Sequence, residues 1–264
     1  MSALAYLRIW LAAVRYSVVR TMMFRFDFFL WLSVDLAWMA VNLLFIEVIY
    51  AHTDNLAGWN KAQMILLVGT AMLIMRLCLA FFYTNLASMD RNLREGTMDF
   101  FLAQPGNPLF MIATRRIELD GLFDTIAAVG IVVYGAVSLD LTPGLPDLMC
   151  YAYLVFCGLV VHFSTLTALV SLAFWMTRVQ GIETGYFGVF DLSKLPRGAL
   201  RGVMEIVFVY AFPVVLISNF PAETLLHGAS LGQVLWLTGV TALAFGAAVG
   251  FFHLGLRRYT SASS

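Results

Sequence analysis

Six long apolar stretches fill most of the 264-residue chain and set the strongest limit on its fold. Each stretch is long enough to cross a hydrocarbon core of about 30 Å at about 1.5 Å per helical residue. The sequence therefore predicts an all-α membrane protein with six transmembrane helices, over residues 24–50, 62–88, 121–139, 148–176, 202–220 and 231–256.

The basic residues lie almost entirely in every second connection between these stretches. Lys61 is in another connection, and Arg76 is inside a stretch. Cytoplasmic connections of membrane proteins carry an excess of Lys and Arg, so this asymmetry predicts that both termini are cytoplasmic. The remaining fourteen of the sixteen basic residues are Arg8, Arg15, Arg20, Arg25, Arg91, Arg94, Arg115, Arg116, Arg178, Lys194, Arg197, Arg201, Arg257 and Arg258.

The composition agrees with a membrane protein that has no separate soluble domain. Hydrophobic residues make up 61% of the chain, and the net charge of zero indicates nothing about nucleic acid. The longest segments outside the apolar stretches are 1–23, 89–120 and 177–201, each too short to bury a core of its own. We therefore expect one transmembrane domain over residues 24–256, with a cytoplasmic tail at 257–264.

The N-terminal segment 1–23 precedes the first apolar stretch and has the pattern of an interfacial helix. Apolar residues recur near helical spacing, while Arg8 and Arg15 project from a common face. Such a basic, moderately amphipathic helix suits the headgroup region of an anionic membrane surface. It can serve as an anchor alone or as a working elbow helix, and the pattern does not separate the two.

The connection 89–120 contains a short predicted element between two chain breakers. Gly96 can end a preceding helix, and the run Pro105–Pro108 stops the element at 98–103. Within it, the pair Phe100 and Phe101 follows Asp99. An exposed aromatic side chain on a stiff turn fits a groove of a partner protein. The same pair can equally pack on the chain's own helices or in lipid.

No motif for catalysis, cofactor binding or metal binding is visible. The chain has no GxxxxGK[ST] loop for nucleotide phosphates, no HExxH and no GxSxG. Cys78, Cys150 and Cys157 fall in or beside apolar stretches, without the spacing of a metal site, and are expected to pack as small apolar residues. The sequence therefore predicts no catalytic residue, no metal site and no cofactor bound by this chain.

A few charged residues inside the apolar stretches are candidate functional groups. Asp35 and Arg76 lie at similar predicted depths, about 16 and 18 Å from the cytoplasmic side, on consecutive helices. A charge is costly in hydrocarbon, so we predict that they form an ion pair. The pair can lock two helices together or contact a substrate. Asp124 is expected to be partly hydrated near a cytoplasmic end, and Glu47 near the external end is a candidate exit residue.

Several segments together resemble a known family. The loop LREGTMDFFLAQPGNPLF, the segment PAETLL at 221–226 and the tail RRYTSASS at 257–264 are similar to those of ABC-2-type permeases. Within that family, the chain looks like the six-span subunits of bacterial drug-efflux and viologen-exporter-like ABC exporters. The matching loop positions are Gly96, Asp99, Phe100, Leu102 and Pro105.

The resemblance implies an exporter subunit with an amphipathic interface helix, driven by a separate ABC ATPase that binds ATP and Mg²⁺. It implies a short coupling helix between spans two and three, and a second, identical or related permease in a dimer. Pro221 and Glu223 would lie near a short external re-entrant segment that caps the exit. The residues expected to contact the ATPase are Glu95, Gly96, Asp99, Phe100, Phe101, Leu102 and Pro105.

The function predicted from the sequence is therefore a permease subunit of an ATP-driven exporter in the bacterial inner membrane. Its cargo is expected to be an amphiphilic or cationic small molecule. The alternative is an ion-coupled secondary carrier, or a membrane scaffold subunit that transports nothing. Co-purification of an ATPase separates these functions.

Overall fold

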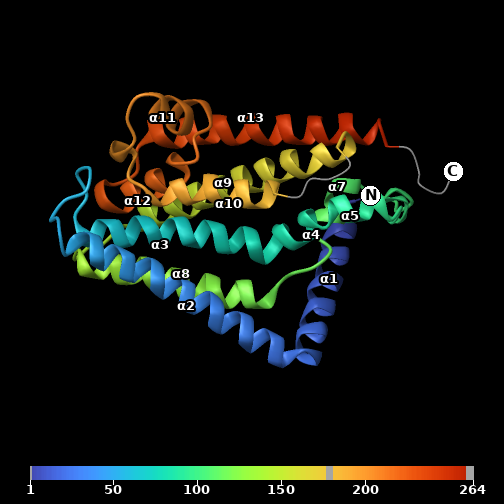
Figure 1. Ribbon diagram of the computed structural model, residues 1–264, viewed down its shortest axis with the longest axis horizontal. Helices are drawn as coiled ribbons and strands as arrows, with labels where there is room; N and C mark the ends of the chain where they lie inside the picture. Colours follow the sequence, from blue (N-terminus) through green and yellow to red (C-terminus); the bar gives the residue numbers. More distant parts are fainter. Residues whose placement is uncertain (1, 177–180, 260–264) are drawn as a thin grey trace.

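The computed structural model describes residues 2–176 and 181–259, and all regular elements within these ranges are helical. The long helices run side by side along one axis, and α1 crosses them at one end of the bundle (Figure 1). The longer helices are α1 (Ala3–Met23), α2 (Arg25–Tyr50), α3 (Lys61–Cys78), α8 (Leu119–Ser138), α9 (Leu145–Ser171), α10 (Ile182–Asp191), α12 (Leu216–His227) and α13 (Leu231–Leu256).

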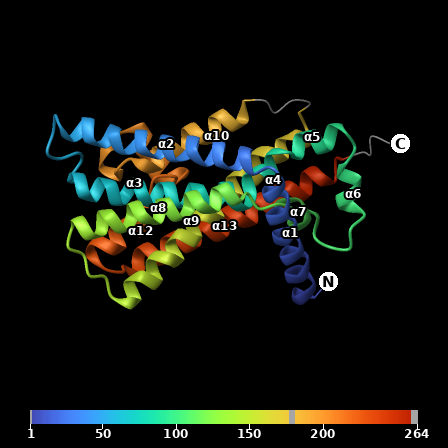
Figure 2. The same cartoon turned by 90° about the horizontal axis from the view of Figure 1, so that it is seen from below.

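Short helical pieces continue or join these helices. In chain order they are η1 (Leu79–Tyr83), α4 (Thr84–Ala87), α5 (Met89–Arg94), α6 (Met98–Leu102), α7 (Pro108–Ala113), η2 (Leu172–Phe174), η3 (Leu192–Lys194), η4 (Arg197–Ala199), α11 (Val203–Glu205) and η5 (Ile206–Ala211). The pieces α5, α6 and α7 lie near the end that α1 crosses, whereas the 51–60 loop lies at the opposite end (Figure 2).

Five helical runs in the described residues are long and apolar enough to span a membrane. They correspond to five of the six apolar stretches and cover Arg25–Tyr50, Lys61–Arg94, Leu119–Ser138, Leu145–Phe174 and Leu231–Leu256. A sixth span is reached only if the bent pair Val203–Ala211 and Leu216–His227 counts as one crossing. The chain is therefore a multi-pass helical membrane protein.

The close packing of α3 against α8 depends on glycines. A Cβ added to Gly121 would lie 2.9 Å from the Cα atom of Ala80, and one added to Gly135 would lie 3.0 Å from the Cα atom of Leu66. Gly69 in turn faces Val132. Small residues let membrane helices approach closely, because little else drives their association in lipid. These contacts fix an antiparallel register between α3 and α8.

We expect Gly121→Ala to destabilise the protein, whereas Gly130→Ala on the same helix should not. A methyl group at Gly121 meets backbone that cannot turn away, and overpacking of this kind costs about 1–3 kcal/mol. A Cβ at Gly130 meets nothing within 4 Å. Thermal unfolding of both variants in detergent checks the difference, and equal melting temperatures would show that the register does not depend on Gly121.

The segment after α9 departs from the sequence prediction. Residues 177–201 were expected to stay on the cytoplasmic side, together with Lys194 and Arg197. Instead, α10, η3 and η4 follow the bundle axis toward the 51–60 loop, where a Cβ on Gly198 would lie 3.2 Å from the carbonyl oxygen of Ala57. Lys194 Nζ donates to Asn42 Oδ1 at 3.0 Å. These bases are thus at the end opposite to the one predicted; Arg178 lies outside the described residues.

The physical reason is that α10 packs like a membrane helix. Tyr186 and Phe190 are 2% and 1% exposed. The hydroxyl of Tyr186 lies 2.9 Å from His162 Nδ1 of α9 and 3.4 Å from Cys78 Sγ of α3. Because Lys194 and Arg197 both have acidic partners, their charges do not hold them at the end where the other basic residues gather.

The stretch 202–220 is not one continuous helix, contrary to the sequence prediction. It is broken at Phe212–Val215, and the two arms meet at 77°. Pro213 lies in this break, and proline cannot donate the backbone hydrogen bond that a continuing helix needs. The break lies beside residues 161–168 of α9 and 240–251 of α13. The second arm, α12, returns to the end where Asp147 starts α9, because Asp147 Oδ1 accepts from Ala229 N.

Candidate functional site: a buried charge cluster and the two ends of the bundle

A cluster of three charges lies between α2, α3 and α8. Arg76 Nη1 on α3 donates to Asp35 Oδ1 on α2 at 2.6 Å and to Asp124 Oδ2 on α8 at 3.1 Å. Arg76 is 8% exposed and Asp124 is 0% exposed. One guanidinium thus joins the three helices, and we call Asp35, Arg76 and Asp124 the charge cluster.

The burial of Asp124 corrects the expectation that hydration at a helix end would stabilise this group. Asp124 is on the second turn of α8, but the glycine-defined register places that turn opposite Arg76 rather than in water. Gly121, one turn earlier, contacts Ala80, one turn beyond Arg76. The close approach of the two helices excludes water, and Arg76 takes its place.

The charge cluster has one more acid than base. Two carboxylates surround a single guanidinium, and among the described residues Asp124 Oδ1 has no hydrogen-bond partner. A buried charge without a partner is costly, so Arg76 stabilises both acids at once. Asp35 keeps 30% of its side chain exposed and is the member of the cluster most accessible from outside the bundle.

The turn predicted to couple to an ATPase is built around Gly96. Gly96 has φ +70°, a left-handed conformation that favours glycine, and lies where the chain turns between α5 and α6. Asn107 Oδ1 accepts from Phe110 N, and Pro108 occupies the first turn of α7. The turn therefore holds α6 between two fixed helix ends. Of the predicted contact residues, Glu95, Phe100, Leu102 and Pro105 are exposed.

The two phenylalanines of α6 have different environments. Phe100 is 64% exposed, whereas Phe101 is 3% exposed and packs in the core with Met98 and Leu109. The guanidinium of Arg115 lies 5.5 Å from the centre of the Phe101 ring, a cation–π contact. Phe101 therefore holds α6 on the protein, and Phe100 is the aromatic side chain of this pair that is free to meet a partner.

At the opposite end, Glu223 joins three segments. Its carboxylate lies 3.4 Å from Arg197 Nε and accepts from Gln233 Nε2 of α13 at 2.5 Å. Pro221 is buried inside α12. Glu47 forms an exposed ion pair with Lys61 at 2.5 Å. Of the three predicted exit residues, Pro221 and Glu223 therefore lie on α12, and Glu47 lies near the end of α2 that leads into the 51–60 loop.

Asn219 ties the linker before α11 to α12, a role that the sequence did not indicate. Its Oδ1 accepts from Arg197 N at 2.9 Å, and its Nδ2 donates to Leu195 O at 3.0 Å. Asn219 is 0% exposed. Ser218 Oγ also donates to Ser193 O. The only sequence signal was a polar pair in an apolar run, which usually marks side chains that bond across helices in membranes.

We expect Asn219→Ala to loosen the broken segment and lower thermal stability. The substitution removes the hydrogen-bond partners of two partly buried groups, Arg197 N–H and Leu195 C=O, at a cost of up to about 1–3 kcal/mol for each. Asn42→Ala is the control, because Lys194 then keeps its ion pair with Asp191 at 2.7 Å. Melting temperatures in detergent compare the two; an Asn219 variant no less stable than the Asn42 variant would refute the role of Asn219.

The fold and these sites define a multi-pass membrane protein with a broken helix at one end and a protruding turn at the other. The family model described as ABC-2 family transporter protein matches residues 36–263. The chain belongs to the ABC-2 transporter family. No curated protein and no solved structure gives a significant match to the chain.

Membership of this family has direct consequences. ABC-2 permeases are membrane subunits and not enzymes themselves, and the family implies association with an ABC ATPase subunit. The prediction of an ABC-2-type permease from the sequence is confirmed.

Proposed function

We propose that this chain is the permease subunit of an ATP-driven exporter and moves an amphiphilic or cationic small molecule out of a bacterial cell. The observation that carries the proposal is the family match over residues 36–263. ATP and Mg²⁺ bind to the partner ATPase, and this chain supplies the route across the membrane.

The ATPase docks on α6, with Phe100 as the anchor. Support comes from the exposure of Phe100 at 64% beside a buried Phe101, and from the left-handed turn at Gly96. Rigid aromatic side chains give contact area at low conformational cost, and they dominate many interfaces. A turn fixed at both ends can transmit a displacement of the ATPase to α5 and α7.

The end of the bundle that contains α5, α6 and α7 faces the cytoplasm. Support comes from the basic residues that gather there, in agreement with the positive-inside rule. They are Arg8, Arg15, Arg20, Arg25, Arg91, Arg94, Arg115, Arg116, Arg257 and Arg258. The broken segment 203–227 then faces outward and caps the exit, with Glu223 at its base.

A second permease, identical or related, completes the transport pathway. Few side chains of α2 are buried in the single chain, chiefly Met39 and Ile46. Its long apolar surface is therefore available to a second permease as well as to lipid. A pathway between the two permeases would bring Asp35 within reach of a cationic cargo, because that carboxylate is partly exposed.

Co-purification tests the proposal. A tagged chain, solubilised in mild detergent from its native membrane, is expected to retain an ABC ATPase in stoichiometric amount. A preparation that never retains an ATPase, with transport that follows a proton gradient and ignores ATP, would instead identify a secondary carrier. A chain that retains neither an ATPase nor transport activity would identify a scaffold subunit.

A further inference from the structure

A polar crevice opens where α1 meets α2, beside the start of α8. It has a volume of about 350 Å³. Its walls come from the end of α1, the first two turns of α2 and the segment that leads into α8. The residues that line it are Ser17, Arg20, Thr21, Phe24, Asp27, Phe28, Trp31, Arg116, Ile117, Glu118 and Asp120.

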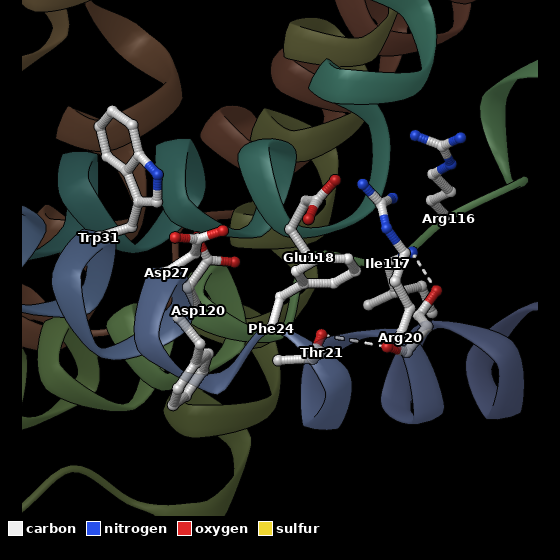
Figure 3. A pocket seen from close by; sticks show the side chains of 11 residues that line it. Arg20, Thr21, Phe24, Asp27, Trp31, Arg116, Ile117, Glu118 and Asp120 are labelled. Carbon is white, nitrogen blue, oxygen red and sulfur yellow. Dashed lines mark hydrogen bonds between the residues drawn. The ribbon is translucent and has the colours of Figure 1, made fainter.

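The two basic side chains of the crevice lie together without acidic partners. Figure 3 shows the guanidinium groups of Arg20 and Arg116 on one side of the crevice. Neither group lies within 4 Å of a carboxylate of the described residues. Burial, followed by the neighbouring charges of Arg20 and Arg115, lowers the pKa of Arg116. These two guanidinium groups therefore have no ion-pair partner and are available to an anion.

Two carboxylates occupy the other side of the same crevice, Asp27 from α2 and Asp120 from α8 (Figure 3). A third, that of Glu118 just before α8, lies between them and the guanidinium groups. None of the three has a basic partner within 4 Å among the described residues. The indole of Trp31 lies beyond them at the far end of the crevice. A cation is thus offered carboxylates and an aromatic face together.

The back of the crevice is fixed by a hydrogen bond between α1 and the segment before α8. Ile117 N donates to Ser17 Oγ at 3.0 Å, and both residues are buried. Ser17 in turn donates to Ala13 O on its own helix at 2.9 Å. This bond therefore fixes α1, which carries Arg20, against the segment that carries Arg116.

The surroundings of the crevice are apolar and exposed. Met23, Phe24, Phe26 and Phe29 are each more than half exposed, at 73%, 57%, 77% and 61%. They lie at the start of a helix that is long and apolar enough to cross the membrane, and therefore at the level of the lipid headgroups. The polar headgroup of an amphiphilic molecule in the crevice would contact the charged side chains. Its hydrocarbon tail would contact the exposed aromatic side chains.

We propose that this crevice binds the headgroup of a phospholipid that carries both a phosphate and a protonated amine. The phosphate accepts hydrogen bonds from Arg20 and Arg116. The amine donates to the carboxylates of Asp27 and Asp120, on the side of the crevice where Trp31 lies. Two bases and three acids side by side match a zwitterion and disfavour a headgroup that is only anionic. The proposal needs only the membrane location of the chain, so it does not depend on ATP-driven transport.

The bound lipid would also stabilise the elbow between α1 and α2. Residues of α1, α2 and the α8 entry then all contact one headgroup, although they make few charged contacts with one another. The lipid replaces the missing ion pairs and holds α1 across the end of the bundle, the orientation seen in Figure 1.

Native mass spectrometry of the purified full chain tests this site. The protein is reconstituted with equal amounts of dioleoyl phosphatidylethanolamine and dioleoyl phosphatidylglycerol, and the lipids retained are counted. We expect the wild-type chain to retain phosphatidylethanolamine in roughly tenfold preference, the effect of about one charge-assisted hydrogen bond. If the wild-type chain retains phosphatidylglycerol equally well, or if millimolar inorganic phosphate displaces the lipid, the proposal is wrong.

Two pairs of substitutions separate the halves of the site. Arg20→Gln with Arg116→Gln is expected to lower retention of both lipids, whereas Asp27→Asn with Asp120→Asn should abolish only the preference for the amine headgroup. Arg8→Gln with Arg15→Gln removes the same charge from α1 outside the crevice and serves as the matched control. If that control lowers retention as much as the crevice variants, general charge attraction explains binding and the proposed site is wrong.

Discussion

Replacing Arg76 with glutamine is expected to remove most of the folded protein. Asp35 and Asp124 would then lie in the membrane without a cation, and Asp124 is 0% exposed. Loss of one partner from a buried ion pair typically costs about 3–5 kcal/mol, which is a large part of the stability of most domains. The yield of monodisperse protein after solubilisation, and its melting temperature, measure this loss.

Neutralising the whole charge cluster should restore much of that stability. In the combined variant Arg76→Gln, Asp35→Asn and Asp124→Asn, no uncompensated charge remains, and amides can still hydrogen bond across the three helices. Asp35→Asn alone is expected to be mild, because Arg76 keeps Asp124 at 3.1 Å. If the single Arg76 variant is as stable as the wild-type chain, or the combined variant is worse, the cluster does not hold the helices together.

Replacing Phe100 with alanine is expected to leave the permease folded but to release the ATPase. The side chain is 64% exposed, so the single chain loses little by its removal. At an interface, truncation of an aromatic anchor costs about 2 kcal/mol or more, which weakens binding roughly 30-fold. ATPase retention on the tagged permease, together with its melting temperature, gives both readouts.

Phe101→Ala provides the matched contrast within the same helix. Phe101 is 3% exposed and contacts Arg115, so its loss should open a cavity and destabilise the permease by about 3–5 kcal/mol. The sequence treated the two phenylalanines as equivalent, and the structure separates them. A Phe100 variant that keeps full ATPase retention, with normal stability, would exclude Phe100 as the anchor.

The sequence predicted the elements in which one physical rule dominates. Long apolar runs gave five spanning helices, because hydrocarbon requires helices of that length. Gly96 and the Pro105–Pro108 run predicted the turn around α6, since few residues tolerate those backbone angles. The predicted depths of Asp35 and Arg76 in the membrane were similar, and in the structure Arg76 Nη1 lies 2.6 Å from Asp35 Oδ1.

The segment after α9 was mispredicted because two rules conflict there. Lys194 and Arg197 favoured the cytoplasmic side by charge, whereas Tyr186 and Phe190 form part of the core by packing. Asn42, which binds Lys194, and Glu223, which pairs with Arg197, lie far away in the sequence, so the sequence did not show these contacts. The helix α10 itself is only 10 residues long, below the length by which a membrane span is recognised.

Asp124 was missed for a related reason. Its position near the start of α8 suggested contact with water, and a helix end is usually hydrated. The glycines at 121 and 135 were the available signal, because they point to close packing against α3. Because Gly121 lies opposite Ala80 and the two helices are antiparallel, Asp124, one turn further along α8, lies opposite Arg76, one turn before Ala80. The sequence alone does not say which helix those glycines face.

ATP-dependent transport is the most direct measurement of the proposed function. Inside-out vesicles are prepared that contain the chain and the ATPase with which it co-purifies. A fluorescent amphiphilic cation is then added to the solution outside them. We predict accumulation in the vesicles that requires ATP and is lost in the Phe100→Ala variant. Accumulation driven by an imposed proton gradient in the absence of ATP, and unaffected by loss of the ATPase, would contradict an ATP-driven exporter.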